Sequence, residues 1–450
     1  MNNNSLNNLV LWFKDCSYEN KHLVGGKSSS LGELYNLSKE LKFSIGNGFT
    51  LTTKLYDYFI KHNNLEEIIE SILLSVDYNN LELLEKKSLN LRNNIMNGEM
   101  PVELENIIIN YYQQLCNIYN SSNIEVAIRS SGLAEDLPNA SFAGQHDTYL
   151  NISGNSDIIK YIKHCFASLF NVRAISYRKT NNISISDTKI SVAIQKMIRS
   201  DLGSAGVAFS IDPETGYNKA IVINSAFGLG ELVVSGGVKP DEFILDKRII
   251  SQNGFDPIID IKKGEKNTKI IYNKLGGVLE VSTNKFEKNN YSMKKENIIK
   301  LGKIILNLEK KYCSLFKKNV GVDIEWAYDG NDNNIYIIQT RPETIHSNNN
   351  NLEICNYGLE NRSKIITEGV AVGDKISNGK AKLLRSLQEY KNFNKGDILV
   401  TDMTTPDWEP IMKISSGIIT NKGGRTCHAA IVARELGVNA LVGTENATDV

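Results

Sequence analysis

The hydrophobic pattern of the chain begins with helical spacing. Leucines recur three and four positions apart over residues 27–41, which places them on one face of a helix. A longer mixed stretch over residues 52–120 indicates several further helices. We therefore predict that the N-terminal part of the chain is rich in helix.

Apolar runs of strand length begin near Ile124 and recur through the middle of the chain. Five of them follow one another: EVAIRSS, KISVAIQKMI, SAGVAFSI, KAIVINSAFG and DEFILD. Helical patterns lie over residues 158–178 and 294–316. The middle of the chain therefore combines strands with helices.

The segment VDIEWAYDGNDNNIYIIQTRP predicts a β-hairpin, because two alternating runs flank a turn rich in Asp, Gly and Asn. Residues two apart in a strand share a face, so Asp323 and Glu325 point together, as do Gln339 and Arg341. With the turn centred near Asp332, we predict Glu325 opposite Gln339 and Asp323 opposite Arg341.

An asparagine-rich segment, HSNNNNLEI, follows the hairpin and has no hydrophobic period, which is typical of a linker. Short strands and glycine turns come after it in EGVAVGDKISNGKAKLL, GDILVTDM and SGIITNKGG. The predicted fold class is α+β, with a large domain over residues 1–345, a linker over 346–352 and a small α/β domain over 353–450.

Composition narrows the classes of function. The 450 residues are 41% hydrophobic, and 51 Lys and Arg balance 51 Asp and Glu, so no nucleic-acid partner is indicated. No apolar run is long enough to cross a bilayer, and the first residues lack the pattern of a signal peptide. The six cysteines form no CxxC pair, which argues against a zinc cluster or disulfide framework and favours a cytoplasmic protein.

Two motifs carry candidate phosphate contacts. In VGGKSSSLGEL, Lys27 opens a helix, where free backbone N–H groups and the helix dipole favour an anion. In AIRSSGLAEDLPNASFAGQ, Arg129 ends an apolar run beside hydroxyls and is suited to bind an oxyanion. A plain helix start and a salt-bridged arginine in a surface loop are the alternatives.

Two further motifs carry candidate ribose and metal contacts. In SAFGLGELVVSGGVKPDEFIL, Glu231 and Asp241 are candidates to accept hydrogen bonds from ribose or to lie near a metal, and a glycine-rich bend is the alternative. In the hairpin, Glu325 and Gln339 offer the hard oxygen ligands that Mg²⁺ prefers, with Arg341 beside the phosphates. An ordinary hairpin with a solvated polar face is the alternative there.

The segment GGRTCHAAIVAREL places His428 between a glycine-rich loop and a helix. Neutral imidazole is nucleophilic near pH 7, because its reference pKa is about 6.5. A phosphoryl group on it would lie beside free helix N–H groups. The alternatives are a structural histidine and the neighbouring Cys427 as nucleophile, although a thiol is mostly protonated unless it is activated.

Taken together, these motifs resemble the phosphoenolpyruvate synthase (pyruvate, water dikinase) family of PEP-utilising enzymes. They occur in the order VGGKSSSLGEL, AIRSSGLAEDLPNASFAGQ, CFASLFNVRAISYR, SAFGLGE, DIEWAYDG, YIIQTRPET and GGRTCHAAIVARELG, and the resemblance extends from about Leu9 to Val450. It implies an ATP-grasp-like nucleotide-binding domain, a small swivelling β/β/α phosphohistidine domain and a C-terminal barrel that binds pyruvate and phosphoenolpyruvate.

The resemblance also implies a reaction, in which ATP, pyruvate and water give AMP, phosphoenolpyruvate and phosphate, with Mg²⁺ as the cofactor. It implies the following roles: His428 as phosphoryl carrier, Lys27, Arg129 and Arg341 as ATP-phosphate contacts, and Glu325 and Gln339 as Mg²⁺ ligands. Thr426 matches a threonine that a regulatory kinase phosphorylates, and a phosphate there would crowd the carrier with like charge.

The sequence printed here stops before any barrel, partway through the expected small domain. We therefore expect a fragment or one half of a split enzyme, which carries only the ATP and histidine half-reaction. A pyruvate, phosphate dikinase or antibiotic phosphotransferase relative and an inactive fragment are the alternatives. The expected partners are ATP and, through the barrel, pyruvate or phosphoenolpyruvate, with a regulatory kinase and a second copy in a homodimer as further candidates.

Overall fold

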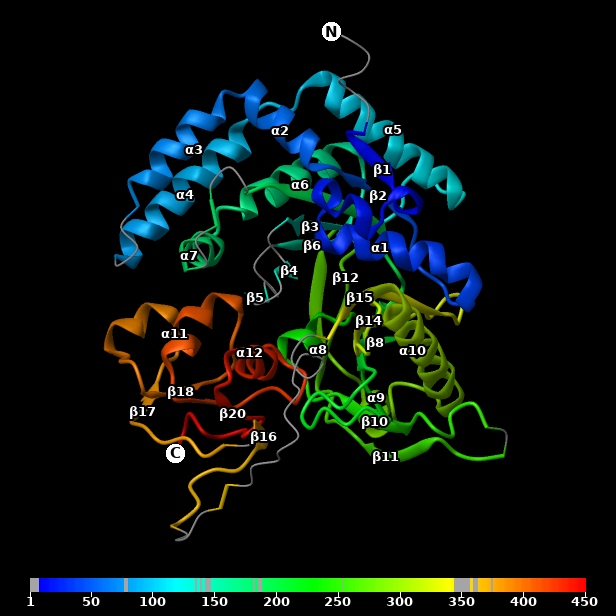
Figure 1. Ribbon diagram of the computed structural model, residues 1–450, viewed down its shortest axis with the longest axis vertical. Helices are drawn as coiled ribbons and strands as arrows, with labels where there is room; N and C mark the ends of the chain where they lie inside the picture. The colour runs from blue at the N-terminus through cyan, green and yellow to red at the C-terminus, as the bar shows by residue number, and fades with distance from the viewer. Residues whose placement is uncertain are drawn as a thin grey trace. The chain divides into compact units, whose positions relative to one another are not determined.

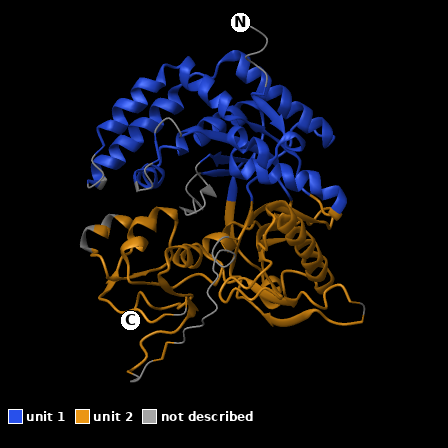
Figure 2. Ribbon diagram, viewed as in Figure 1, with its two compact units in different colours: residues 1–40, 45–198, 272–278 blue, residues 41–44, 199–271, 279–450 orange. Residues whose placement is uncertain are grey.

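The computed structural model describes residues 8–76, 80–133, 136–137, 140–141, 147–180, 183–184, 188–252, 254–343, 357–358, 363–373 and 375–450 (Figure 1). The chain divides into two compact units (Figure 2). The first comprises residues 1–40, 45–198 and 272–278, and the second comprises residues 41–44, 199–271 and 279–450. Both contain helices and strands, and the linker predicted over residues 346–352 lies outside the described residues.

The first unit contains a five-stranded antiparallel sheet with the order β1-β2-β7-β3-β6. Its strands are β1 (Val10–Trp12), β2 (Gly48–Leu51), β3 (Val126–Gly132), β6 (Thr148–Ile152) and β7 (Ile190–Lys196). The three central strands are almost wholly buried, which explains their continuous apolar runs. A short hairpin of β4 (Asp136–Leu137) and β5 (Ala140–Ser141) follows β3. The strands predicted from EVAIRSS and KISVAIQKMI are confirmed.

Seven helices accompany the first sheet among the described residues. They are α1 (Lys21–Leu41), α2 (Thr53–His62), α3 (Leu65–Leu74), α4 (Leu81–Asn97), α5 (Val102–Ile118), α6 (Asn155–Ser168) and α7 (Val172–Thr180). Apolar residues of α2 to α6 pack with the strands in one hydrophobic core. The helix predicted over 158–178 is two helices, because three successive tight turns over residues 166–171 end α6 and Asn171 accepts the first bond of α7.

The second unit contains a six-stranded antiparallel sheet with the order β11-β10-β9-β8-β14-β15. Its strands are β8 (Ser204–Phe209), β9 (Ala220–Phe227), β10 (Asp241–Asp246), β11 (Ile258–Lys262), β14 (Val322–Tyr328) and β15 (Ile335–Pro342). The accompanying helices are α8 (Glu231–Ser235), α9 (Lys285–Asn289) and α10 (Lys295–Phe316), and the chain also forms a ribbon of β12 (Thr268–Tyr272) and β13 (Val278–Ser282). The strands predicted from SAGVAFSI, KAIVINSAFG and DEFILD are confirmed.

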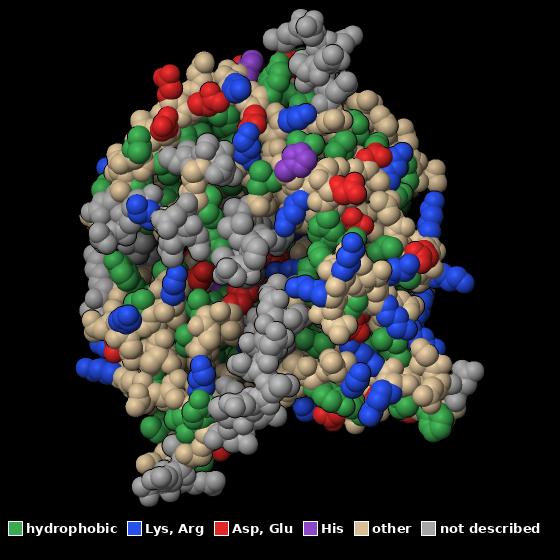
Figure 3. Space-filling model, viewed as in Figure 1, with side chains coloured by type: hydrophobic (Ala, Val, Ile, Leu, Met, Phe, Trp, Pro, Cys, Tyr) green, Lys and Arg blue, Asp and Glu red, His purple; other side chains and the backbone are tan. Residues whose placement is uncertain are grey.

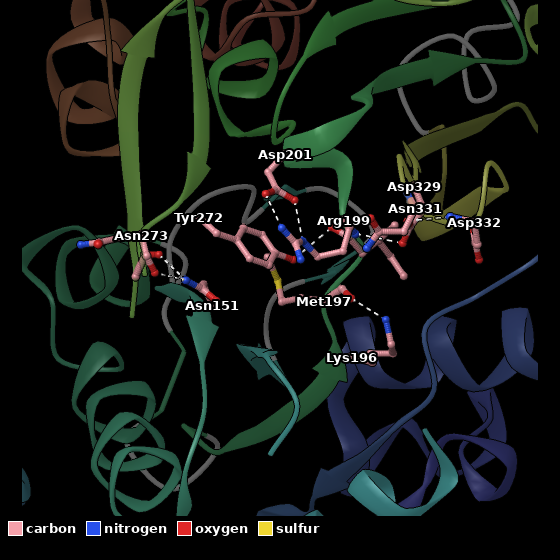
Figure 4. A network of polar contacts seen from close by, with 12 residues as sticks. Asn151, Lys196, Met197, Arg199, Asp201, Tyr272, Asn273, Asp329, Asn331 and Asp332 are labelled. Carbon is pink, nitrogen blue, oxygen red and sulfur yellow. Dashed lines mark hydrogen bonds and ion pairs between the residues drawn. The ribbon is translucent and has the colours of Figure 1, made fainter. Parts of the chain in front are cut away.

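The β14–β15 hairpin has both predicted pairs: Glu325 pairs with Gln339 and Asp323 with Arg341. The register shifts by one residue between Glu325 and Trp326, so that Tyr328 pairs with Ile335 nearer the turn. Its turn is shaped by Asp329, whose carboxylate accepts hydrogen bonds from the backbone N–H groups of Asn331 and Asp332 at 2.8 and 3.3 Å. The same carboxylate accepts the Arg199 N–H at 3.0 Å, while the Arg199 side chain is paired with Asp201 (Figure 4). A carboxylate that accepts several N–H groups of a turn stabilises that turn.

The second unit also contains a smaller sheet with the order β16-β20-β19-β18-β17. Its strands are β16 (Val370–Val372), β17 (Ala381–Leu383), β18 (Ile398–Thr401), β19 (Gly417–Thr420) and β20 (Asn439–Val442). The last four run parallel to one another, and β16 is antiparallel to β20. Apolar residues of α11 (Glu409–Ile414) and α12 (His428–Leu436) pack with these strands in a core of their own.

Two properties concern the described part of the chain as a whole. None of its helices combines the length and the apolar character that a bilayer span requires. On the face shown in Figure 3, Lys and Arg side chains are intermixed with Asp and Glu, in keeping with the formal net charge of zero.

Candidate functional site

Lys27 lies against strand β3, the strand that carries Arg129. Gly25 has a φ of +72°, which interrupts α1 and places Lys27 in the first turn after the break. A Cβ at Gly25 would lie 2.4 Å from the carbonyl oxygen of Ser131, so a glycine is needed for this close approach to β3. The Lys27 ammonium donates to the carbonyl oxygen of Ser130 at 3.2 Å. The structure therefore brings the first two predicted motifs together within the first unit.

The hydroxyls beside Arg129 mainly hold this arrangement in place. Ser131 Oγ donates to the carbonyl of Val24 at 3.1 Å and accepts the N–H of Ser28 at 3.3 Å. Ser130 Oγ donates to the carbonyl of Asp147 at 2.8 Å. Lys27 and Arg129 are thus the members of the two motifs with charge to offer an anion, and Arg129 also donates to Gln195 Oε1 at 3.4 Å.

The hairpin of the second unit carries Asp323, Glu325, Gln339 and Arg341 as two facing pairs. Arg341 donates from Nε and Nη2 to one oxygen of Asp323, at 3.1 and 3.0 Å. Burial raises the pKa of Asp323, although the charge of Arg341 opposes that shift. This contact orients the guanidinium along the same face that carries Glu325 and Gln339.

The Glu325–Gln339 pair places a carboxylate and an amide on neighbouring strands, and Gln339 is buried. Among the described residues, no cluster of three or more His, Cys, Asp and Glu side chains has the arrangement of a metal site. Two oxygen ligands suit Mg²⁺, because this ion usually takes one or two protein ligands and completes its octahedron with water and phosphate oxygens.

Glu231 and Asp241, the predicted ribose contacts, lie in different surroundings. Glu231 is exposed at the start of α8. Asp241 is fully buried, and its oxygens accept from the Lys266 ammonium at 2.5 Å, the Gly264 N–H at 2.9 Å, and both the N–H and hydroxyl of Ser292 at 2.8 Å. Asp241 is therefore engaged by protein donors on both oxygens, whereas Glu231 is exposed as a residue although partial burial of its carboxyl raises its pKa.

His428 is the first residue of α12 and is only 9% exposed. Its Nδ1 lies 3.0 Å from the hydroxyl oxygen of the buried Thr404. When Nδ1 carries the ring proton and donates it to Thr404, Nε2 keeps the lone pair that a nucleophile needs. The hydrogen-bonding role of Thr404 was not predicted from the sequence, because nothing in the surrounding TDMTTPDWEP distinguishes it.

Cys427, the rival nucleophile, occupies the N-cap position of α12 and is 2% exposed. Burial raises its pKa, and nearby backbone N–H groups only partly offset that effect. The thiol is therefore protonated near neutral pH, so its environment favours His428 as the reactive group.

Two further contacts near His428 were not predicted from the sequence. Asn224 on β9 donates to the hydroxyl of the buried Thr426 at 3.1 Å, and Arg434 of α12 is ion-paired with Glu214. These partners lie 202 and 220 residues apart in the chain, and each alone has no distinguishing local pattern.

Comparison with known proteins adds an independent observation. Residues 21–358 match the family model described as "Pyruvate phosphate dikinase, AMP/ATP-binding domain", and residues 393–450 match "PEP-utilising enzyme, mobile domain". The chain is 43% identical to the phosphoenolpyruvate synthase of Aquifex aeolicus and 42% identical to that of Helicobacter pylori, over 98% of this chain and 52% and 55% of those proteins. It is 40% identical to the phosphoenolpyruvate synthase of Escherichia coli, over 100% of this chain and 56% of that protein.

The chain thus spans about half the length of the curated relatives it matches. The match to the first model covers well over half of the chain and includes the hairpin and the motifs of Lys27 and Arg129, and the second match includes His428. The chain therefore belongs to the family of the pyruvate phosphate dikinase AMP/ATP-binding domain, with a PEP-utilising mobile domain after it.

Proposed function

We propose that this chain carries out the ATP-dependent half of a phosphoenolpyruvate synthase reaction and forms a phosphohistidine at His428. The observation that carries the proposal is His428 at the start of α12, with Nδ1 engaged by Thr404 and Nε2 as the remaining ring nitrogen. The whole reaction proposed is ATP + pyruvate + H₂O = AMP + phosphoenolpyruvate + phosphate. The names of the relatives and the two family matches support it.

The proposed chemistry at His428 is a displacement at phosphorus. The Nε2 lone pair attacks the β-phosphorus of ATP, the bond from that phosphorus to the α,β-bridging oxygen breaks, and AMP leaves with the electron pair. Water then removes the γ-phosphoryl group as phosphate, which leaves a single phosphoryl group on Nε2 for pyruvate. Thr404 holds Nδ1 throughout and so keeps Nε2 turned toward the reacting phosphorus.

The cationic side chains are proposed to neutralise the phosphates of ATP. Lys27 and Arg129 supply two positive charges, and Arg341, oriented by Asp323, supplies a third. Glu325 and Gln339 would hold Mg²⁺, which supplies charge neutralisation and alignment of the phosphate oxygens when it is bound. Exposed Glu231 is proposed to accept from ribose hydroxyls, whereas Asp241 acts through the Lys266 and Ser292 contacts that it organises.

The wider organisation is proposed on the same basis. Residues 1–345 would form an ATP-grasp-like nucleotide-binding domain, and residues 353–450 a swivelling phosphohistidine domain. Thr426 is proposed as a site of regulatory phosphorylation, since a phosphate two residues before His428 would repel the phosphates of ATP. Use of ATP and pyruvate fits a cytoplasmic location.

The test is incubation of the chain with Mg²⁺ and ATP labelled in the β-phosphate. We expect protein-bound label that is lost in acid and kept in alkali, with AMP formed in step. His428→Asn should abolish the label, whereas Cys427→Ser should retain it, because the imidazole rather than the thiol carries the phosphoryl group. Absence of label on the parent chain, or label that persists in His428→Asn, would contradict the proposal.

A further inference from the structure

Three consecutive residues that precede His428, residues 425–427, are held by different parts of the second unit. The Arg425 carbonyl oxygen accepts from Arg434 Nη2 at 2.5 Å, and the Thr426 hydroxyl accepts from Asn224 Nδ2 at 3.1 Å. A Cβ added to Gly236 would lie 2.4 Å from the Cβ of Cys427, so this glycine leaves the room that the Cys427 side chain occupies. Each of the three residues before His428 is thus in contact with another part of the second unit, through the Arg425 carbonyl and the side chains of Thr426 and Cys427.

Arg434 connects this segment to the loop between β8 and β9. It lies in the last turn of α12, its side chain is 7% exposed, and it forms an ion pair with Glu214, which is 14% exposed. Burial lowers the pKa of Arg434 to about 10, with the charge of Asp212 opposing the shift, so the guanidinium stays charged at neutral pH. One guanidinium therefore binds both Glu214 and the Arg425 carbonyl.

Glu214 is itself held in place before it meets Arg434. The Asp212 carboxylate accepts the Glu214 N–H at 2.8 Å, and the Asp212 carbonyl accepts the Gly216 N–H at 2.9 Å, which closes a turn around Glu214. Asn224 is fixed equally well, because it is 2% exposed on β9 and flanked by paired strands. The contacts to residues 425–427 thus come from residues that are themselves hydrogen-bonded or buried.

We propose that Glu214, Arg434 and Asn224 are positioning residues that hold residues 425–427, and through them His428, in the arrangement that accepts the phosphoryl group of ATP. This inference rests on the proposed function. None of the three side chains belongs to the core of the smaller sheet, so their loss should leave that core intact. Loss of these side chains should instead misplace His428, and a displacement of about 1 Å can slow a reaction about 100-fold.

The first experiment measures the single-turnover rate of His428 phosphorylation by β-labelled ATP. We expect Glu214→Gln and Asn224→Ala each to lower this rate at least tenfold, while the Kd for ATP changes less than twofold. Glu280→Gln and Arg385→Gln are matched controls, because both side chains are exposed in the second unit, and they should keep the parent rate. Parent-like rates in the two test variants, or a parallel loss of ATP affinity, would overturn the proposal.

A double-mutant cycle tests whether Glu214 and Arg434 act as one unit. We expect Glu214→Gln combined with Arg434→Gln to be about as slow as the slower single variant, because either change breaks the same contact. Independent, multiplying effects would show that the ion pair does not position the segment.

Hydrogen exchange of the backbone amides of residues 423–436 gives a readout that does not depend on activity. We expect faster exchange around residues 425–428 in Glu214→Gln and Asn224→Ala, with the rest of the smaller sheet unchanged. Unaltered exchange would overturn the inference even if the parent chain forms no phosphohistidine, a result that would by itself contradict only the proposed function.

Discussion

At the scale of single residues, the surroundings of His428 and Cys427 assign different properties to adjacent side chains. Nδ1 of His428 is hydrogen-bonded to the Thr404 hydroxyl, whereas burial raises the pKa of the Cys427 thiol. From the sequence both residues are candidate nucleophiles, since either side chain can attack phosphorus. Both side chains are buried, and they differ in what surrounds them: burial raises the pKa of the Cys427 thiol, whereas Nδ1 of His428 lies beside the Thr404 hydroxyl.

The raised pKa of Cys427 predicts slow alkylation. An ordinary thiol with a pKa of about 8.5 is partly ionised at pH 8. The pKa of Cys427 is raised, so at the same pH a smaller fraction of this thiol is ionised. Iodoacetamide should therefore label Cys427 much more slowly than the unfolded chain at pH 8, with the rate still rising above pH 9. Peptide mass spectrometry across pH 7 to 10 measures this rate, and labelling of Cys427 that levels off near pH 8 would contradict the burial argument.

The candidate site was predictable where its residues carry a local signature. Lys27, Arg129 and His428 each stand beside glycines or at the end of an apolar run, so their positions were visible in the sequence. Thr404 and Asn224 were not, because their role comes only from the side chain that folding brings opposite them. Residues that position other residues act through tertiary contacts, and these contacts cannot be predicted from spacing along the chain.

At the scale of elements, the two site pairs of the hairpin were predicted correctly, whereas its register shift between Glu325 and Trp326 and the break in one helix were not. Period-two alternation and a short polar turn fix a hairpin register locally, and Asp329 collects the N–H groups of that turn. The pattern over residues 158–178 is apolar at helical spacing throughout and conceals the break before α7. That break depends on contacts such as Asn171 with the Asp147 carboxylate at 3.2 Å, which lie outside the segment.

Gly25 gives a prediction about how α1 is joined to β3. Gly25→Ala should destabilise the chain for two reasons: the residue has a φ of +72°, and its new Cβ would overlap the Ser131 carbonyl at 2.4 Å. Gly154→Ala is the matched control, because its φ is +88° in the same unit with nothing within 4 Å of the added Cβ. The control should lose about 1 kcal/mol of unfolding free energy from backbone strain, and Gly25→Ala should lose more, about 3 kcal/mol.

Urea denaturation of the two glycine variants measures both losses, and the difference between them isolates the close approach from the backbone strain. Equal losses would show that α1 can shift away from β3 without cost. If Gly25→Ala loses more unfolding free energy than the control, it should also bind ATP more weakly, since Lys27 lies in the turn that would have to move.

At the scale of the whole molecule, the family match and the structure support the proposed function in different ways. The family models cover residues 21–358 and 393–450, which hold all the predicted site residues. The structure shows the local surroundings of those residues: cations beside β3, two oxygen ligands on the hairpin and a hydrogen-bonded histidine at a helix start. Each of these surroundings is suited to one part of a metal-bound nucleotide or to its reaction. A ligand that binds to them in the folded chain alone must stabilise that folded chain.

Binding of ATP with Mg²⁺ should therefore raise the free energy of unfolding, by about 2.7 kcal/mol when the ligand is present at 100 times its Kd. Glu325→Gln should remove the part of this gain that depends on the metal, because a neutral amide is a weaker Mg²⁺ ligand than a carboxylate. In EDTA the unfolding free energy of the variant and of the parent chain should rise equally with ATP, since the cationic side chains are unchanged.

Thermal unfolding with and without Mg²⁺ measures all four states, with Glu280→Gln as the control. An equal loss in Mg²⁺ and in EDTA would mean that Glu325 supports the fold or the nucleotide directly, and would contradict its role as a metal ligand.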